Sequence, residues 1–324
     1  MKLGIMGAGM IVSAFLPEIL QVEEISVLGI YARRIDAAKS LCLQYNIPLA
    51  TDDPEVLFAS GIDTVYVAVS NIAHYDFCKA ALEHGLNVIV EKPITANVSQ
   101  ALELQALAME KQRFLFEAIT TLHMGPYRKV IEWLPRIGII RNAESVYTQR
   151  SSRLDAFLSG KVLPAFDRNL AGGCLMDLNV YCIHYIMGIF GTPTEAIYYP
   201  NLQNNIDTSG RVILQYPGFT AHCYAAKDCG GDHGSIIQGT NGYIKTVLPP
   251  NQVGEAVLCL QDGTEEHFDD GSGMTRAASE FRIFAKAIRE NDLDFCYSAL
   301  EKSIAVSQVM TDLRKQAGIL FPCD

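Results

Sequence analysis

The sequence feature that most constrains the fold is a glycine motif directly after the first apolar segment. Lys2–Met6 has the character of a short strand, and Gly7-Ala8-Gly9-Met10-Ile11-Val12 follows it. Gly7 permits a tight turn, and Gly9 lets a pyrophosphate approach the backbone at a helix N-terminus, with Met10 and Ile11 as further cofactor-binding candidates. Val12 stands where the third glycine of the G-x-G-x-x-G fingerprint serves helix–strand packing. The motif therefore predicts a dinucleotide site after the first strand.

The first 118 residues alternate short apolar strands with helical patterns. This alternation predicts an α/β fold with a doubly wound parallel sheet of the Rossmann type. The expected elements are the strands Lys2–Met6, Ile25–Tyr31, Thr64–Val69, Asn87–Val90 and Arg113–Ala118 and the helices Ile11–Leu20, Ile35–Tyr45, Ala73–Glu83 and Val98–Lys111.

The strand Asn87–Val90 ends abruptly in Glu91-Lys92-Pro93. Ligands of open parallel sheets bind beyond the carboxyl ends of the strands, so we expect Lys92 to lie where cofactor and substrate meet. Pro93 restricts the backbone of Lys92 and prevents the strand from continuing, while Glu91 shapes the turn. The alternative is an ordinary solvated turn.

Two further strand ends contribute polar residues to the same edge. We expect Ser70, Asn71 and His74 to lie beside the cofactor, with a helix-capping or surface histidine as the alternative for His74. The second strand ends in Ala32-Arg33-Arg34 and lacks the acid that accepts a hydrogen bond from the ribose of NAD. Arginines complement a 2′-phosphate, which favours NADP(H) over NAD(H), unless these arginines are merely solvated at a helix start.

The pattern changes after residue 119 and predicts a second α/β domain with a large, mostly antiparallel sheet. We expect domains at residues 1–119 and 120–324, with the last helix packing back on the first domain. The expected elements are the strands Ala143–Ser152, Glu195–Pro200, Thr208–Tyr216, Phe219–Tyr224, Ser235–Gly239, Tyr243–Leu248 and Ala256–Gln261 and the helices Pro126–Leu134, Arg276–Glu290 and Ala299–Gln316.

Composition restricts the partners. The formal net charge of −10 argues against nucleic acid or an anionic membrane surface as the main partner. No apolar run approaches the length of a membrane span, and a strand that begins at Lys2 leaves no room for a signal peptide. The nine cysteines show no C-x-x-C pair or metal-ligand spacing, so we expect reduced thiols, a cytoplasmic location and no metal site.

An acid, a phenol and an imidazole are spaced along one apolar helical segment of the second half. Asp177, Tyr181 and His184 share one face of a helix with about 3.6 residues per turn. A structural polar network is one explanation, because buried polar groups are usually satisfied by neighbours. The functional explanation is a substrate-facing group that meets Lys92 across a domain cleft.

Together, these motifs resemble the glucose–fructose oxidoreductase / inositol dehydrogenase (Gfo/Idh/MocA) family over nearly the whole chain. The resemblance rests on Gly7-Ala8-Gly9, Asn71 with His74, Glu91-Lys92-Pro93, and Gly172-Gly173 followed by Asp177 and Tyr181. Tyrosine at position 181 is similar to the branch with dihydrodiol dehydrogenases and NADP-dependent xylose dehydrogenases.

The resemblance implies that Lys92 is the catalytic lysine, Tyr181 the acid/base and Asp177 a substrate-site acid, with His184 a weaker substrate candidate. It implies hydride transfer between nicotinamide and a carbinol or carbonyl carbon of a sugar, polyol or trans-dihydrodiol. A homodimer or homotetramer through the open sheet of the second domain is also implied. The alternatives are a reductase of a non-sugar carbonyl or imine, and a non-catalytic protein that senses NADP(H).

Overall fold

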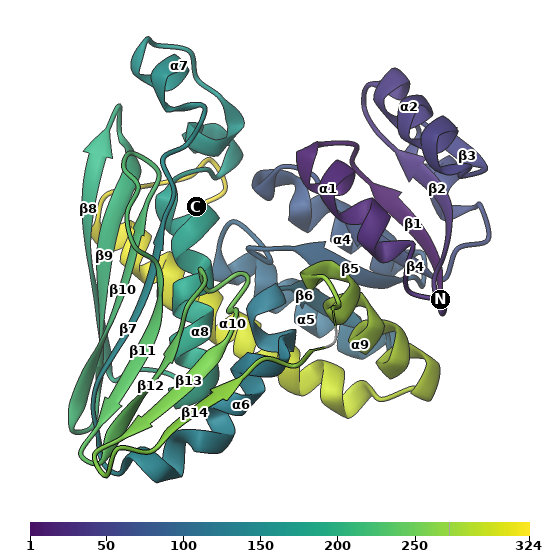
Figure 1. Cartoon of the computed structure of the whole chain (residues 1–324). Coiled ribbons are helices and arrows are strands. Elements are labelled where there is room, and N and C mark those ends of the chain that lie inside the picture. The colour runs from purple at the N-terminus through teal and green to yellow at the C-terminus, as the bar shows by residue number, and fades with distance from the viewer. Residues whose placement is uncertain (272) are drawn as a thin grey trace. The chain divides into compact units, whose positions relative to one another are not determined.

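The computed structural model describes residues 1–271 and 273–324, which form two compact units (Figure 1). The first unit consists of Met1–Ala118 and Met274–Ile304. The second unit consists of Ile119–Gly273 and Ala305–Asp324. The segment Met274–Ile304, from late in the chain, therefore belongs to the first unit. The division into a dinucleotide-binding domain at 1–119 and a substrate domain at 120–324 stays a prediction.

The first unit contains a six-stranded parallel sheet with the order β3-β2-β1-β4-β5-β6. This is the order of the Rossmann sheet, in which the strand order reverses between the parallel strands β1 and β4, and it confirms the predicted fold class. Its strands are β1 (Lys2–Met6), β2 (Ser26–Tyr31), β3 (Leu49–Thr51), β4 (Thr64–Val67), β5 (Asn87–Glu91) and β6 (Leu115–Ala118). Its helices are α1 (Met10–Ile19), α2 (Ile35–Tyr45), α3 (Pro54–Phe58), η1 (Asn71–Ala73), α4 (His74–Glu83), α5 (Val98–Lys111), α9 (Arg276–Glu290) and the first part of α10 (Leu293–Gln316).

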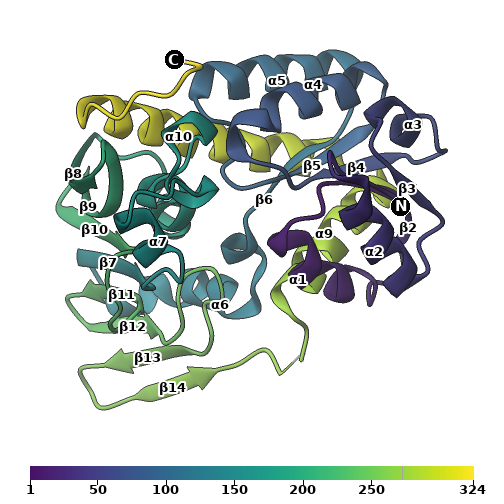
Figure 2. The ribbon, with the colours of Figure 1, turned by 90° about the horizontal axis from the view of Figure 1, so that it is seen from above.

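Helices cover both faces of this sheet (Figure 2). On one face, α1, α2 and α9 pack against strand residues that include Ile89. On the other face, α3, α4 and α5 pack against residues that include Val88. Neighbouring residues of one strand thus enter opposite cores, which is why the strands of this unit are continuous apolar runs.

Helix α9 completes the first of these cores with two aromatic contacts. Phe281 meets the ring of Tyr66 edge-on with centroids 5.0 Å apart, and Phe284 stacks on Phe116 at 4.5 Å. Each such pair stabilises a core by about 0.5–1.5 kcal/mol beyond the buried area. These contacts explain why residues from late in the sequence belong to the first unit.

The sequence did not predict β3 or α3. Strand β3 has only three residues and pairs with β2 alone, so it is too short to show an alternation pattern. Helix α10 begins at Leu293, earlier than the predicted start at Ala299.

The second unit contains an eight-stranded sheet with the order β14-β13-β12-β11-β7-β10-β9-β8. All neighbours are antiparallel except β7 and β10, which confirms a mostly antiparallel sheet. Its strands are β7 (Ile140–Thr148), β8 (Glu195–Gln203), β9 (Ile206–Tyr216), β10 (Phe219–Ala226), β11 (Gly234–Gly239), β12 (Gly242–Thr246), β13 (Ala256–Leu260) and β14 (Glu265–Phe268), of which the sequence did not predict β14.

Helices α6 (Gly125–Trp133) and α8 (Val180–Phe190) pack on one face of this sheet (Figure 1). Figures 1 and 2 show no helix of the described residues against the other face. The connections contain α7 (Leu154–Leu158) and the short 3₁₀ turns η2 (Thr120–His123), η3 (Leu134–Ile137), η4 (Pro164–Phe166) and η5 (Arg168–Leu170). The segment that carries Asp177, Tyr181 and His184 was predicted as one regular helix, but it starts as a π-helix, η6 (Leu175–Asn179), which continues into α8.

One helical segment, Arg168–Phe190, is long and apolar enough to cross a membrane by length and composition. The expectation that no run approaches this length is therefore wrong by that measure. However, 78% of its most apolar window is buried in the structure, which is the behaviour of a core helix in a globular unit.

Candidate active site

The turn after β1 accepts only glycine at position 7. Gly7 has a φ of +123°, and a Cβ built there would lie 2.2 Å from the Ala68 carbonyl oxygen. Its N–H donates to the Tyr31 carbonyl oxygen at 2.8 Å. The turn is therefore held between β2 and the end of β4, and a side chain would force these strand ends apart.

Gly9 is the N-cap of α1 and has open space around it. A Cβ at Gly9 would meet no other atom within 4 Å, and no side chain caps the helix. Met10 is 70% exposed, whereas Val12 is buried in the core beside the sheet. The exposed helix start offers backbone N–H groups to an anion, so these residues fit a dinucleotide pyrophosphate. Val12 fills the packing position of the third glycine, as the sequence predicted.

The end of β2 presents two exposed arginines. Ala32 is buried and its N–H donates to the Thr51 carbonyl oxygen at 3.0 Å, which fixes the backbone before Arg33 and Arg34. Both arginine side chains are exposed at the start of α2. They are therefore accessible to a phosphate group.

Buried hydrogen bonds fix the turn that carries Lys92. The Tyr66 hydroxyl donates to the Glu91 carboxylate, and the Ile94 N–H donates to Glu117 Oε1 at 2.8 Å. His74 Nδ1 lies 2.9 Å from the Pro93 carbonyl oxygen. Lys92 itself is partly exposed, between a buried glutamate and a buried proline. Its backbone is thus held in place from β4, α4 and β6.

His74 acts in this turn as a neutral donor. Its side chain is fully buried at the start of α4, and burial lowers its pKa to about 4, with the charge of Lys92 acting in the same direction. A carbonyl oxygen can only accept, so Nδ1 carries the proton. His74 holds the Lys92 turn, and its predicted contact with the cofactor stays a prediction, as do those of Ser70 and Asn71.

A third buried glutamate lies near this turn and was missed from the sequence. Glu280 of α9 is fully buried beside Glu91 and Glu117, and burial together with these two carboxylates raises its pKa well above the ordinary value. Burial and these neighbours therefore both favour the protonated form of its carboxyl group. The one sequence signal is its position among the buried apolar residues Ala277 and Phe281 of the same helix.

In the second unit, Asp177 forms an ion pair with a lysine that sequence reasoning also missed. Lys227 Nζ donates to Asp177 Oδ2 at 2.7 Å. The lysine side chain is only 3% exposed, whereas that of Asp177 is 37% exposed. Lys227 directly follows the buried strand β10, as Lys92 follows β5, and this position at a strand end was the available signal.

The helix that carries Asp177 is anchored by a buried carboxylate. The N–H of Leu175 donates to Asp207 Oδ2 at 2.5 Å, and the Tyr198 hydroxyl donates to the same oxygen at 2.7 Å. A Cβ at Gly173 would lie 2.2 Å from Asp207 Oδ1, so glycine is required for this approach. The glycine pair of the sequence motif therefore places the helix start against β9.

Tyr181 and His184 are more buried than their predicted roles suggest. The Tyr181 side chain is 6% exposed, with its ring 6.1 Å from that of Tyr147, and His184 is 1% exposed. The π-helix before them has i→i+5 hydrogen bonds, so its wider turn changes the alignment expected for a regular helix. His184 lies near His123, whose pKa is lowered to about 3, mainly by burial and also by the charge of Arg128. Substrate contacts of Tyr181 and His184 stay predictions.

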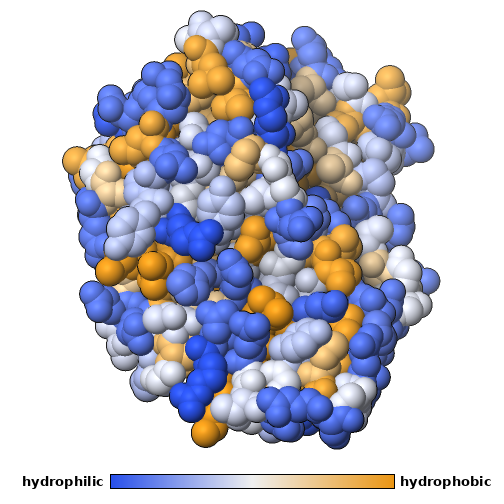
Figure 3. All heavy atoms as spheres, turned by 60° about the vertical axis from the view of Figure 1, so that its left-hand side comes forward, coloured by the Kyte–Doolittle hydropathy of each residue, from blue (hydrophilic) through white to orange (hydrophobic). Residues whose placement is uncertain are grey.

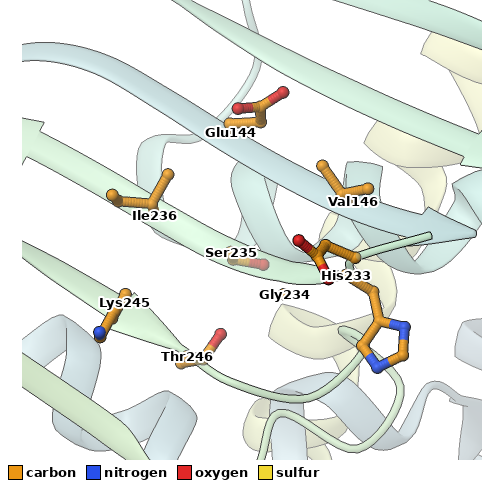
Figure 4. Close-up of a pocket in the computed structure, with 9 residues that line it drawn as sticks. Glu144, Val146, His233, Gly234, Ser235, Ile236, Lys245 and Thr246 are labelled. Carbon is orange, nitrogen blue, oxygen red and sulfur yellow. The ribbon is translucent and has the colours of Figure 1, made fainter.

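A hollow of about 240 Å³ lies elsewhere, on the sheet of the second unit (Figure 4). None of the predicted site residues lines it. It is lined by residues of β7, β11 and β12 and the segment before β11, namely Glu144, Val146, Asp232, His233, Gly234, Ser235, Ile236, Lys245 and Thr246.

Two family models match this chain. Residues 1–119 match the oxidoreductase family with an NAD-binding Rossmann fold, and residues 130–245 match the GFO/IDH/MocA C-terminal domain. The chain is 32% identical to scyllo-inositol 2-dehydrogenase (NADP(+)) IolU of Bacillus subtilis, with 100% of this chain and 99% of that protein covered. It is 26% identical to trans-1,2-dihydrobenzene-1,2-diol dehydrogenase of Mus musculus, with 100% and 99% covered.

The fold is similar to that of a solved ketoreductase. The crystal structure of KijD10, a 3-ketoreductase from Actinomadura kijaniata in complex with NADP and TDP-benzene, gives a TM-score of 0.86 at 23% identity, with 97% of each chain covered. This likeness supports the architecture of the two units.

The open space around Gly9 allows a test of the pyrophosphate site. We expect Gly9→Ala to raise the Kd for NADPH by roughly tenfold or more, because the added methyl group would keep the pyrophosphate from a backbone N–H. A lost hydrogen bond to a charged group costs about 1.5–3 kcal/mol. Stability should change by less than about 1 kcal/mol, because the new methyl group meets no protein atom. Cofactor fluorescence titration and urea unfolding measure the two effects.

Ala14→Ser, at an exposed position of the same helix, is the matched control and should leave both quantities near the parent values. Unchanged NADPH binding by a folded Gly9→Ala variant would contradict a pyrophosphate site at this helix start.

Proposed function

Because the chain belongs to the GFO/IDH/MocA family of NAD(P)-binding oxidoreductases, we propose that its substrate is a neutral polyol, sugar or trans-dihydrodiol. The enzyme is an NAD(P)-dependent oxidoreductase that acts on CH–OH groups. The observation that carries the substrate class is the Asp177 carboxylate, which is partly exposed and paired with Lys227. A carboxylate accepts hydrogen bonds from neutral hydroxyl groups and repels anions. The names of the inositol and dihydrodiol relatives agree with this class.

We propose that Tyr181 exchanges the proton of the reacting hydroxyl group. When bound, the nicotinamide ring supplies or accepts the hydride. A phenol with an ordinary pKa of about 10 is a weak base at neutral pH. A lysine ammonium nearby favours the phenolate, which is the role proposed for Lys92. Asp177 accepts a hydrogen bond from a substrate hydroxyl and orients the reacting carbon.

Removal of either group tests this assignment. We expect Tyr181→Phe and Lys92→Met to lower kcat/KM by about 10²-fold or more, since a general acid–base group contributes that much. NADPH binding by Tyr181→Phe should stay near the parent value, because this change removes one hydroxyl group. Absorbance at 340 nm with a panel of inositols, aldoses and trans-diols measures turnover.

Activity of both variants within about tenfold of the parent would contradict the proposed roles. If the parent chain binds NADPH and turns over none of these substrates, the proposed substrate class is wrong.

We also propose that NADP(H) is preferred to NAD(H). Arg33 and Arg34 are exposed after a buried strand end, and the relative IolU is named as NADP(+)-dependent. A guanidinium binds a 2′-phosphate with charge-assisted hydrogen bonds, each worth about 1.5–3 kcal/mol.

Removal of the Arg33 guanidinium should therefore reduce the preference. We expect Arg33→Ala to lower the ratio of kcat/KM for NADPH over NADH by about 10- to 100-fold. Lys39→Ala removes an exposed cation from α2, the helix that follows Arg33, and is the control for a general effect of charge. An unchanged ratio in both Arg33→Ala and Arg34→Ala would contradict the assignment.

We propose that two or four copies associate through the helix-free face of the second-unit sheet. Ile197 and Tyr199 of β8 are 37% and 59% exposed, and by register they lie beside Ile213 and Arg211 of β9. Figure 3 shows one side of the surface, where hydrophobic residues are interspersed with hydrophilic ones. Such a mixed surface suits an interface between copies.

Sedimentation velocity tests the association. We expect two or four times the chain mass of 35.6 kDa, and a shift toward one copy for Ile197→Asp, because a buried unpaired carboxylate is unfavourable. A single-copy mass at micromolar concentration would contradict the proposal.

A further inference from the structure

We propose that Lys227 is a positioning residue that holds the Asp177 carboxylate oriented to accept a substrate hydroxyl group. This inference rests on the proposed function, since it concerns how the proposed substrate acceptor is held. It assigns a role to a lysine outside the glycine, Lys92 and Tyr181 motifs.

The contacts of the ammonium group show why Lys227 does not bind substrate itself. Nζ donates to Asp177 Oδ2 at 2.7 Å and to the Ala165 carbonyl oxygen at 2.7 Å. It also lies 4.5 Å from the centroid of the Phe166 ring. An ammonium group has three N–H donors, and a carboxylate, a carbonyl and an aromatic face account for three directions.

The backbone of Lys227 is fixed by neighbouring strands. Its N–H donates to the Thr208 carbonyl oxygen at 2.7 Å, and its carbonyl accepts from the Ser151 N–H at 2.8 Å. The position of the ammonium is therefore set by the end of β10 and by β9. Since this ammonium binds Asp177, the sheet determines where the carboxylate points.

Burial differs sharply between the two partners. The Lys227 side chain is 3% exposed and that of Asp177 is 37% exposed. A buried ammonium is costly without a charged partner, so the ion pair keeps the Asp177 carboxylate beside the lysine. Asp207, a second buried carboxylate, also interacts electrostatically with Lys227 and anchors the start of the Asp177 helix. The accessible part of this arrangement is the Asp177 carboxylate.

The lysine also joins Asp177 to the segment before the helix. Ala165 and Phe166 belong to η4, and the Phe166 ring stacks on Phe157 of α7 with centroids 4.6 Å apart. Loss of the ammonium would therefore release Asp177 from this segment.

The test compares two variants, Lys227→Met and Lys227→Arg, with the parent chain. Lys161→Met is the control, because it removes an exposed lysine. With the inositol, aldose and diol panel, we expect Lys227→Met to raise KM by roughly tenfold or more while kcat falls by less, as for lost substrate binding. Lys227→Arg should recover part of the loss, because a guanidinium also binds a carboxylate. NADPH binding and the Lys161→Met variant should match the parent.

A double variant separates positioning from a direct role. In an Asp177→Asn background, adding Lys227→Met should change KM by less than about twofold, because no carboxylate remains to be held. An undiminished effect of Lys227→Met in that background would overturn the inference.

An activity-independent measurement keeps the inference testable if the proposed substrate class is wrong. In a crystal structure of Lys227→Met, we expect the Asp177 carboxylate to adopt a different rotamer from the parent. An unchanged carboxylate would overturn the positioning role, whereas absence of turnover by the parent chain would overturn only the proposed substrate class.

Discussion

The hydrogen bond from His74 to the Pro93 carbonyl oxygen is the contact on which the candidate catalytic turn depends. It is made by a fully buried, neutral imidazole, and it joins the start of α4 to the turn after β5. Tyr66 holds Glu91 on the other side of Lys92. The flexible side chain of Lys92 is thus attached to a rigid backbone. A rigid backbone is needed when a functional group must act at one position.

In the second unit, an ion pair holds the candidate functional group in place, where the first unit uses a neutral hydrogen-bond donor. Lys227 is buried and fixed by backbone contacts, and its ammonium holds Asp177. Asp207 holds the start of the helix through Leu175. Lys92 in the first unit and Asp177 in the second are partly exposed, while the residues that hold them are buried. Tyr181, also proposed to meet the substrate, is buried. Rigid buried supports and accessible functional groups are the expected division of roles in a binding site.

The sequence predicted the residues that carry motifs better than the residues that support them. Gly7, Gly9 and Lys92 were found because a strand, a turn and a helix follow one another locally. Glu280 and Lys227 were missed because their partners are distant in the chain. Glu280 belongs to α9, and its neighbours Glu91 and Glu117 come from β5 and β6. No local sequence pattern predicts a contact between residues that are so distant in the chain.

By itself, the sequence determined the Rossmann architecture, the glycine turn, the strand end before Lys92 and the family, because periodicity and short motifs are local properties. Only the tertiary structure decided that His74 is buried and neutral, that the Asp177 helix begins as a π-helix, and that Lys227 pairs with Asp177. The physical reason is burial. The protonation, partner and orientation of a polar group depend on which distant residues exclude water from it.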